Sequence, residues 1–147
     1  MRNNVLVDGY EQWLERTRIE PDHTSFTFER NVVVGERPRV FKGNWHEKLV
    51  VDHNVYWRPG GAMADFDGHD FATWQKLSGV DAHSAFADPQ FVDAEHGDFH
   101  LKPGSPAAAA GFEPFDAREA GVTGAMKDVP RPTAPVGFPI QKRPWQP

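Results

Sequence analysis

The chain has 147 residues, the length of a single domain, and 13 glycines with 13 prolines favour many turns and little helix. Because the formal charge is -5 and the sequence has no basic stripe, we expect no nucleic-acid partner. The absence of cysteine excludes disulfides, thiolate nucleophiles and cysteine-ligated zinc. Because no apolar run approaches the roughly 18 residues of a membrane span, no membrane partner is expected either.

A short phrase that begins with asparagine occurs three times, at residues 4–7, 31–34 and 54–57. Each asparagine precedes strand-forming residues, and apolar runs at 26–28 and 49–51 precede the second and third copies. Asparagine suits a corner between strands because it tolerates the left-handed backbone region and its amide can bond to stacked equivalents. The repeat predicts a parallel β-helix over residues 1 to about 60, with a polar excursion at residues 15–24.

The middle of the chain predicts one short helix. Residues 70–77 have helical spacing, with Phe71, Trp74 and Leu77 on one face. Asp70 is the expected N-cap and Gly79 the expected C-terminal stop.

Strand character returns at residues 89–93 and 99–101, where a tight turn at 95–98 closes either another coil or a hairpin. The predicted domain organisation is a β-helix with closing strands at 1–116 and a Pro-rich extended tail at 117–147.

Segments at 81–84, 87–93 and 97–107, together with 24–31 and 52–57, resemble the C-terminal end of bacterial right-handed parallel β-helix proteins of the pectate-lyase-like superfamily. The resemblance covers about residues 1–116, and its most specific part runs from Asp88-Pro89 to Ser105-Pro106-Ala107. It implies an all-β fold: a right-handed parallel β-helix, a short solenoid of about three to four coils with one short helix and a Pro-rich tail.

The same resemblance implies action on a polysaccharide or oligosaccharide, of glycoside hydrolase or polysaccharide lyase type, and a secreted or periplasmic parent protein. Since the N-terminal coils that hold most of the cleft in such proteins are absent, the chain is expected to be a C-terminal fragment that contributes to a carbohydrate-binding groove. A non-catalytic β-solenoid module for glycan binding or self-association is the alternative, because fold alone does not fix a reaction. A solenoid that starts at Asn4 exposes an uncapped coil, which predicts a homo-oligomer.

The polar excursion holds the first group of candidate site residues. Arg16 and Arg18 would bind a uronate carboxylate, and Glu20 would act as acid or base; the alternative is a solvated loop with internally paired charges. A second pair, Glu29 and Asp52, stands two residues before repeated asparagines. Stacked about 4.8 Å apart, the two carboxylates would suit a retaining glycosidase, and repulsion would raise one pKa.

The residues assigned to catalysis are therefore Glu20, Glu29 and Asp52. Those assigned to substrate binding are Arg16, Arg18, His23, Trp45 and His53, with Trp45 as a stacking platform for a sugar ring. Exposed acids that simply neighbour Arg30 and His53 are the alternative to the catalytic pair.

No cofactor and no metal site are expected, apart from a weak calcium signal. Residues 65–70 superficially resemble a calcium loop but lack its ligand spacing, and the seven histidines show no helical metal spacing. Asp81, His83 and Ser84 are interpreted as a turn held by side-chain hydrogen bonds, because residues so close in a loop do not form a catalytic triad.

Overall fold

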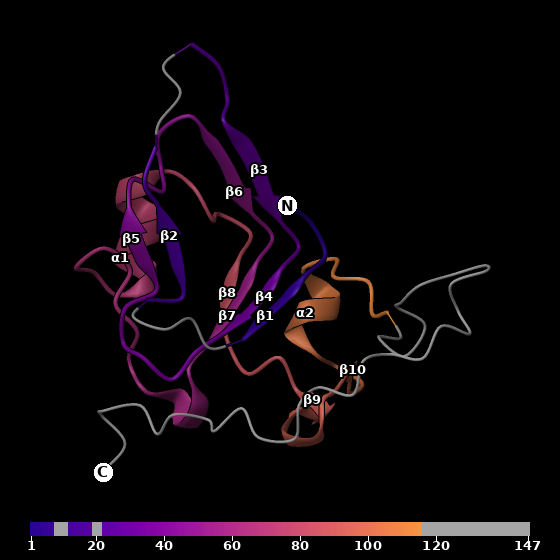
Figure 1. The fold of residues 1–147 in the computed structure, drawn as a ribbon. Helices are drawn as coiled ribbons and strands as arrows, with labels where there is room; N and C mark the ends of the chain where they lie inside the picture. The colour runs from indigo at the N-terminus through magenta and orange to yellow at the C-terminus, as the bar shows by residue number, and fades with distance from the viewer. Residues whose placement is uncertain (8–11, 19–21, 116–147) are drawn as a thin grey trace, which may run out of the picture. The chain divides into compact units, whose positions relative to one another are not determined.

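The computed structural model describes residues 1–7, 12–18 and 22–115, and Met1–Phe115 form one compact unit (Figure 1). Four parallel strands form the largest sheet: β1 (Val5–Val7), β4 (Val32–Val34), β7 (Val55–Trp57) and β8 (Ala85–Phe86), in that spatial order. Two further parallel pairs flank it, β3 (Phe26–Glu29) with β6 (Leu49–Asp52) and β2 (Leu14–Arg16) with β5 (Phe41–Gly43). An antiparallel pair, β9 (Phe91–Asp93) and β10 (Asp98–Leu101), follows.

Short helices complete the described chain. They are α1 (Phe71–Ser78), α2 (Pro106–Ala109) and the 3-10 turns η1 (Pro59–Gly61) and η2 (Ala94–His96). The predicted helix limits are confirmed, since Asp70 accepts a hydrogen bond from the Thr73 N–H and Gly79 adopts a left-handed conformation. The predicted apolar face is only partly correct, because Trp74 is buried whereas Leu77 is 64% exposed. No helix in the described ranges is long and apolar enough to span a membrane.

The asparagine phrases pair in parallel, as predicted. Val5, Val32 and Val55 lie at equivalent register positions of β1, β4 and β7. The buried Asn31 donates hydrogen bonds from its backbone N–H and from its Nδ2 to Oδ1 of Asn54, and both donor–acceptor distances are 3.0 Å. Asn4 makes the same two bonds to Oδ1 of Asn31, over 3.1 and 2.9 Å. The repeated asparagines therefore form a ladder of side-chain hydrogen bonds, and this ladder fixes the register of neighbouring strands.

The residue before each asparagine adopts a left-handed conformation, with φ of 55° at Asn3, 54° at Arg30 and 57° at His53. Non-glycine residues visit this region rarely and at some energetic cost. Arg30 is exposed, and Asn3 and His53 are half-buried, so none of these three side chains belongs to the buried core.

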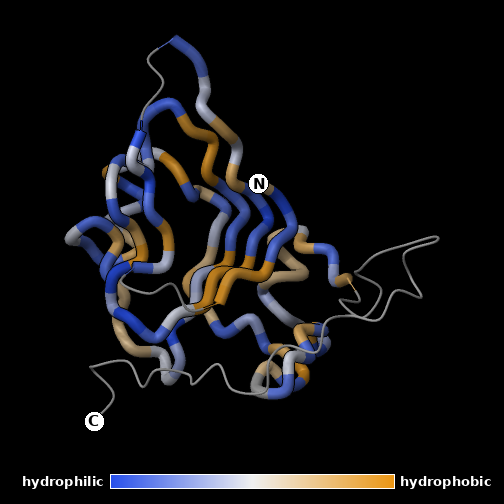
Figure 2. Tube along the Cα trace, viewed as in Figure 1, coloured by the Kyte–Doolittle hydropathy of each residue, from blue (hydrophilic) through white to orange (hydrophobic). Residues whose placement is uncertain are grey.

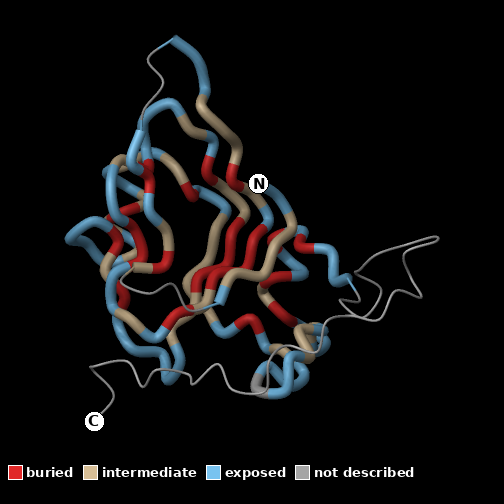
Figure 3. The backbone as a smooth tube through the Cα atoms, in the orientation of Figure 1, coloured by how far each residue is buried: buried red, intermediate tan, exposed pale blue. Residues whose placement is uncertain are grey.

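The core lies between the sheets. Phe28, Phe41, Tyr56 and Phe66 are fully buried, and the hydrophobic and buried colours run across neighbouring central strands in Figures 2 and 3. Edge-on and stacked rings fill this space; for example, Trp45 stacks on Phe41 with ring centroids 5.0 Å apart. Burial of each such side chain contributes about 1.5–3 kcal/mol relative to exposure.

A buried carboxylate ties the core to the loop before β8. Asp81 accepts hydrogen bonds from the Tyr56 hydroxyl, the Trp74 indole N–H, the Ser84 hydroxyl and the Asn54 amide. Burial raises the pKa of the Asp81 carboxyl, and the hydrogen bonds oppose that rise. We call these residues the Asp81 network; it joins β7, α1 and the loop that carries His83.

The predicted all-β, right-handed parallel β-helix is wrong. In the described residues 1–7, 12–18 and 22–115, the strands form four separate small sheets, one of them antiparallel, with short helices between them. The asparagine phrase determines the pairing of β1, β4 and β7, but it does not determine the rest of the fold, in which strands of two to four residues alternate with short helices and Pro- and Gly-containing segments such as η1. The turn at 95–98 closes a hairpin, one of the two outcomes considered.

Candidate metal centre

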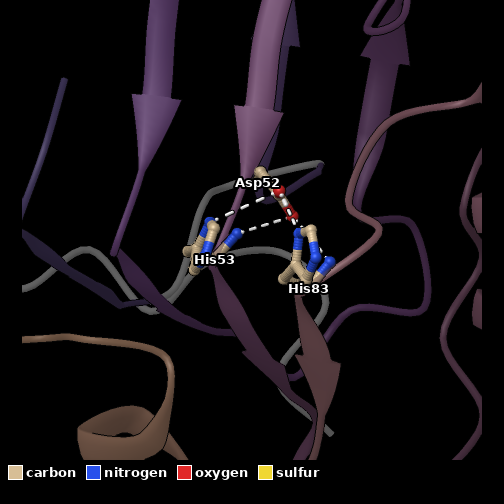
Figure 4. Close-up of side chains that lie close together, drawn as sticks. All are labelled: Asp52, His53 and His83. Carbon is tan, nitrogen blue, oxygen red and sulfur yellow. Dashed lines mark hydrogen bonds and ion pairs between the residues drawn. The ribbon is translucent and has the colours of Figure 1, made fainter.

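Three polar side chains converge where β6 ends and the loop before β8 passes it: Asp52, His53 and His83 (Figure 4). Asp52 is the last residue of β6, His53 forms the left-handed corner before Asn54, and His83 lies between α1 and β8. Figure 4 shows nitrogen atoms of both imidazoles turned toward the Asp52 carboxylate. We call these three residues the Asp52 cluster.

Backbone hydrogen bonds hold the cluster in place. Oδ1 of Asp52 accepts the backbone N–H of His53 over 2.9 Å and that of His83 over 2.7 Å. In the adjacent turn, the Asn54 N–H donates to the Ser84 hydroxyl over 2.8 Å, which anchors the residue after His83. One carboxylate oxygen is thus used to join two turns that lie 31 residues apart in the chain, and the other remains available to side chains.

The second carboxylate oxygen faces both imidazoles. Oδ2 of Asp52 lies 2.7 Å from Nδ1 of His83 and 3.3 Å from Nδ1 of His53. The two rings stack with centroids 4.9 Å apart and planes 21° apart. The His83 side chain is 69% exposed, that of His53 41% and that of Asp52 21%, so that solvent reaches the cluster from the imidazole side.

The Asp52 carboxylate is kept ionised. Partial burial alone would raise its pKa, but hydrogen bonds from the His83 side chain, from the backbone N–H groups of His83 and His53, and the nearby His53 charge outweigh burial, so the pKa lies below its ordinary value. A carboxylate that remains ionised beside two imidazoles retains the negative charge that a cation needs.

The donor set matches a divalent transition metal. One ligand atom from each residue can be chosen so that all lie within 4.8 Å of one another. Zinc bonds of about 2.0–2.2 Å in a tetrahedron place neighbouring ligand atoms about 3.3–3.5 Å apart. The separation of 3.3 Å between Asp52 Oδ2 and His53 Nδ1 has this value, whereas the separation of 2.7 Å between Asp52 Oδ2 and His83 Nδ1 is shorter and would have to increase to admit an ion.

Two other histidine–aspartate pairs lie on the β9–β10 hairpin. Nδ1 of His96 is 2.8 Å from Asp93, and Nδ1 of His100 contacts Asp98. Neither pair gains a third ligand within the same distance limit, and across the described ranges the Asp52 cluster stands alone in combining three donors. These pairs therefore serve as internal controls for histidine–aspartate contacts without a metal geometry.

The predicted carboxylate pair does not behave as a like-charge pair. Glu29 and Asp52 are register partners in β3 and β6, as predicted. Glu29, however, pairs with Arg2 over 3.0 Å, whereas Asp52 pairs with the imidazoles. The expected rise of one pKa is absent at Asp52: burial raises its pKa, but the hydrogen bonds from His83 and His53 and the nearby His53 charge outweigh burial and lower it.

Several predicted binding residues are structural. Arg16 is buried, and its guanidinium donates to the backbone oxygens of Arg18, Asn44 and Glu47, so it is not placed to bind a substrate carboxylate. Trp45 is 3% exposed and stacked in the core, which rules it out as a platform for a sugar ring. Both predictions failed because the sequence does not show that these polar or aromatic groups have internal partners.

The remaining predicted residues are dispersed. Arg18 and His23 are exposed and lie outside the Asp52 cluster, and Glu20 lies outside the described residues. In the segment considered for calcium, an Asp65 oxygen accepts the Gly68 N–H and an Asp70 oxygen caps α1 over 2.7 Å. Those two carboxylates thus stabilise local turns.

His83 is the residue that sequence reasoning missed. Residues 84–86 occupy the same register as the asparagine phrases, because Ala85 pairs with Val55 and Phe86 with Tyr56. Ser84 replaces the asparagine, so His83 stands where His53 stands one strand earlier. A search for a degenerate copy of the phrase, with serine in place of asparagine, would have aligned the two histidines.

Comparison with known proteins leaves the family open. No family model matches the chain, and no solved structure matches it significantly. The chain is similar to a Bacillus subtilis (strain 168) protein named "Uncharacterized protein YwoF", with 34% identity over 101 residues that cover 60% of this chain and 21% of that protein. The chain therefore spans about a fifth of the length of this curated relative, and the similarity assigns neither a family nor an activity to it.

Proposed function

We propose that this chain binds a divalent transition metal ion, with zinc as the best match, through Asp52, His53 and His83. The observation that carries the proposal is the convergence of two stacked imidazoles on one ionised carboxylate oxygen, at 2.7 and 3.3 Å. Imidazole nitrogen with carboxylate oxygen is a zinc donor set, whereas calcium and magnesium prefer oxygen alone.

The exposed geometry supports a site with an open position. Three protein ligands leave at least one coordination position of a tetrahedral ion for water, and closed structural zinc sites use four protein ligands instead. His83 is 69% exposed, so a small ligand can approach the ion from solvent. A zinc ion held in this way would polarise a bound oxygen or lower the pKa of a bound water.

The test is zinc affinity, measured by competition with a chromophoric chelator after treatment with EDTA. His83→Ala and Asp52→Asn should each weaken binding by at least about tenfold, because each removes one of three ligands. His96→Ala is the matched control, since it removes an exposed histidine that pairs with an aspartate elsewhere. Equal affinity in the wild type, His83→Ala and His96→Ala would contradict the proposal.

The pH dependence of binding provides a second readout. Zinc requires neutral imidazoles, so affinity should fall as the pH drops below about 6.5, the ordinary histidine pKa. Cobalt substitution adds a spectroscopic signature: tetrahedral Co²⁺ absorbs in the visible range, and His83→Ala should abolish the band. A pH-independent zinc affinity would point to binding outside the histidines.

Action on a polysaccharide is a second proposal. It rests on the resemblance of residues 1–116 to carbohydrate-active proteins and on the exposed contact of 2.7 Å between Asp52 and His83, which has the groups of a general acid–base pair. New reducing ends or unsaturated uronates should form from acidic polysaccharides with the wild type and with His96→Ala, but not with Asp52→Asn. No turnover by the wild type would contradict it.

A further inference from the structure

The turn at residues 81–84 presents His83 to the candidate metal centre. Its first residue is anchored to β6, because the Asp81 N–H donates to the Val51 carbonyl with a donor–acceptor distance of 2.7 Å. Its last residue closes the turn, since the Ser84 N–H donates to the Asp81 carbonyl with a distance of 3.1 Å. The backbone of His83 is therefore held between two anchored residues.

A side-chain amide from α1 bridges the two ends of this turn. Nε2 of Gln75 donates to the Asp81 carbonyl at a distance of 2.5 Å and to the Ser84 carbonyl at 3.4 Å. Both acceptors are carbonyl oxygens, which matches the two donors of an amide NH₂ group. Gln75 is half-buried and lies in a helix whose N-terminus is capped by Asp70. The turn is thus tied to α1 as well as to β6.

His83 depends on such support more than the other two candidate ligands do. Asp52 and His53 are consecutive residues, so a single stretch of backbone at the end of β6 places both. His83 lies 31 residues after Asp52, and its side chain is the most exposed of the three, at 69%. The approach of its imidazole to Oδ2 of Asp52 therefore depends on the turn that carries it.

We propose that Gln75 is a positioning residue for the metal centre: its amide holds the turn that carries His83 and thereby sets the affinity for the ion. This inference rests on the proposed function. Among the described residues, the Gln75 amide contacts the turn and none of the three ligand side chains, so it acts through the placement of His83. Groups that orient metal ligands typically change metal affinity by 10–100-fold when they are removed.

Zinc affinity is the first test. Gln75→Met keeps the length of the side chain and suits a helix but removes both donors, so it should weaken zinc binding about tenfold and alter the visible band of the Co²⁺-substituted protein. Chelator competition and absorption spectra measure the two effects. Zinc affinity and a Co²⁺ spectrum equal to those of the wild type would overturn the proposal.

Ser78→Ala is the matched control on the same helix. The Ser78 hydroxyl donates to the Trp74 carbonyl and accepts the Val80 N–H, so its removal weakens the end of α1 without removing a bond to the turn at 81–84. This variant should keep the zinc affinity and the Co²⁺ spectrum of the wild type. If it loses as much affinity as Gln75→Met, the effect is a general loss of helix stability and the positioning role is overturned.

A measurement without metal separates this inference from the proposed function. The rings of His53 and His83 are stacked with centroids 4.9 Å apart, which is close enough for a nuclear Overhauser effect between their protons. In EDTA-treated protein this effect should weaken in Gln75→Met and persist in Ser78→Ala. If the wild type binds no zinc, the proposed function fails, and the ring contact still decides the role of Gln75: an unchanged effect in Gln75→Met would overturn it.

Circular dichroism verifies that each variant folds. If Gln75→Met does not fold, Gln75→Ala takes its place, because alanine also removes the amide and has the highest helix propensity. The expected results are the same for this variant: weaker zinc binding and a weaker contact between the rings of His53 and His83.

Discussion

Asp52 and Asp81 are aspartates in neighbouring turns, and the Asp81 N–H donates to Val51 beside Asp52. Asp81 is fully buried, and protein donors surround it. Asp52 is partly exposed, and two imidazoles face one of its oxygens. Both carboxylates accept several hydrogen bonds, yet the pKa of the buried Asp81 is raised and that of the partly exposed Asp52 is lowered. Desolvation decides which carboxylate is structural and which remains available to a ligand.

The largest expected effect is that of Asp81→Ala. The change leaves buried donors of Trp74 and Tyr56 without an acceptor, which costs roughly 3 kcal/mol or more of unfolding free energy. Urea denaturation measures this loss, with Asp22→Ala as an exposed control that should leave stability almost unchanged. A loss no greater than that of the control would show that the Asp81 network is not a stabilising centre.

Asn31→Ala should rank second, at about 1–3 kcal/mol, because Asn31 is buried and its amide bonds on both sides in the ladder. Asn4→Ala removes an amide at the half-buried edge and should cost less. Thermal unfolding of both variants gives the order directly. Equal losses would mean that burial does not distinguish the inside of the ladder from its edge.

Asp52→Asn should have a smaller, pH-dependent effect in the presence of EDTA. Because the folded pKa of Asp52 lies below its ordinary value of 3.8, its contribution is present above pH 3.8 and is lost as the pH falls through the folded pKa. The stability difference between wild type and variant should be at most about 1 kcal/mol at pH 7 and vanish in acid.

Asp81 has the opposite sign: its raised pKa favours folding below 3.8, and this contribution is lost as the pH rises through the folded pKa. Unfolding curves from pH 2 to 7 separate the two carboxyl groups. A wild-type advantage over Asp52→Asn that grows in acid would contradict a lowered pKa at Asp52.

Glu29→Gln should have the smallest effect. Glu29 forms a surface ion pair with Arg2, whose side chain is 62% exposed, and such pairs contribute about 0–1 kcal/mol. Zinc affinity and any polysaccharide activity should remain those of the wild type. Loss of zinc affinity or of polysaccharide activity in Glu29→Gln would show that Glu29 belongs to the site together with its register partner Asp52.

The sequence revealed local structure better than assembly. The strands after Asn4, Asn31 and Asn54, the register between them and the cap at Asp70 follow from local preferences, and the structure contains them. How the strands assemble into sheets cannot be predicted from local preferences, because it depends on the paths of the connecting segments, whose residues have low strand preference. The unpredicted strands β2 and β5 lie in such segments.

The site was predicted in part. Asp52 was predicted to act in catalysis and His53 in carbohydrate binding. The third member, His83, was missed because it belongs to a copy of the repeat in which Ser84 stands in place of the asparagine. Arg16 and Trp45 were misassigned because a side chain that points inward cannot be recognised from residue type alone.

The left-handed corners at Asn3, Arg30 and His53 give the molecule a row of exchangeable positions. Each corner precedes a strand of the same sheet, neighbouring strands lie about 4.8 Å apart, and the asparagine that follows each corner maintains the register. The side chain of Asn3 is hydrogen-bonded to the backbone of Glu113, whereas Arg30 is exposed, so Arg30 is the corner residue that substitution can change with the least disturbance of the fold. Arg30→His would place a third imidazole at the position that His53 occupies one strand later, and would extend the proposed metal site along the sheet.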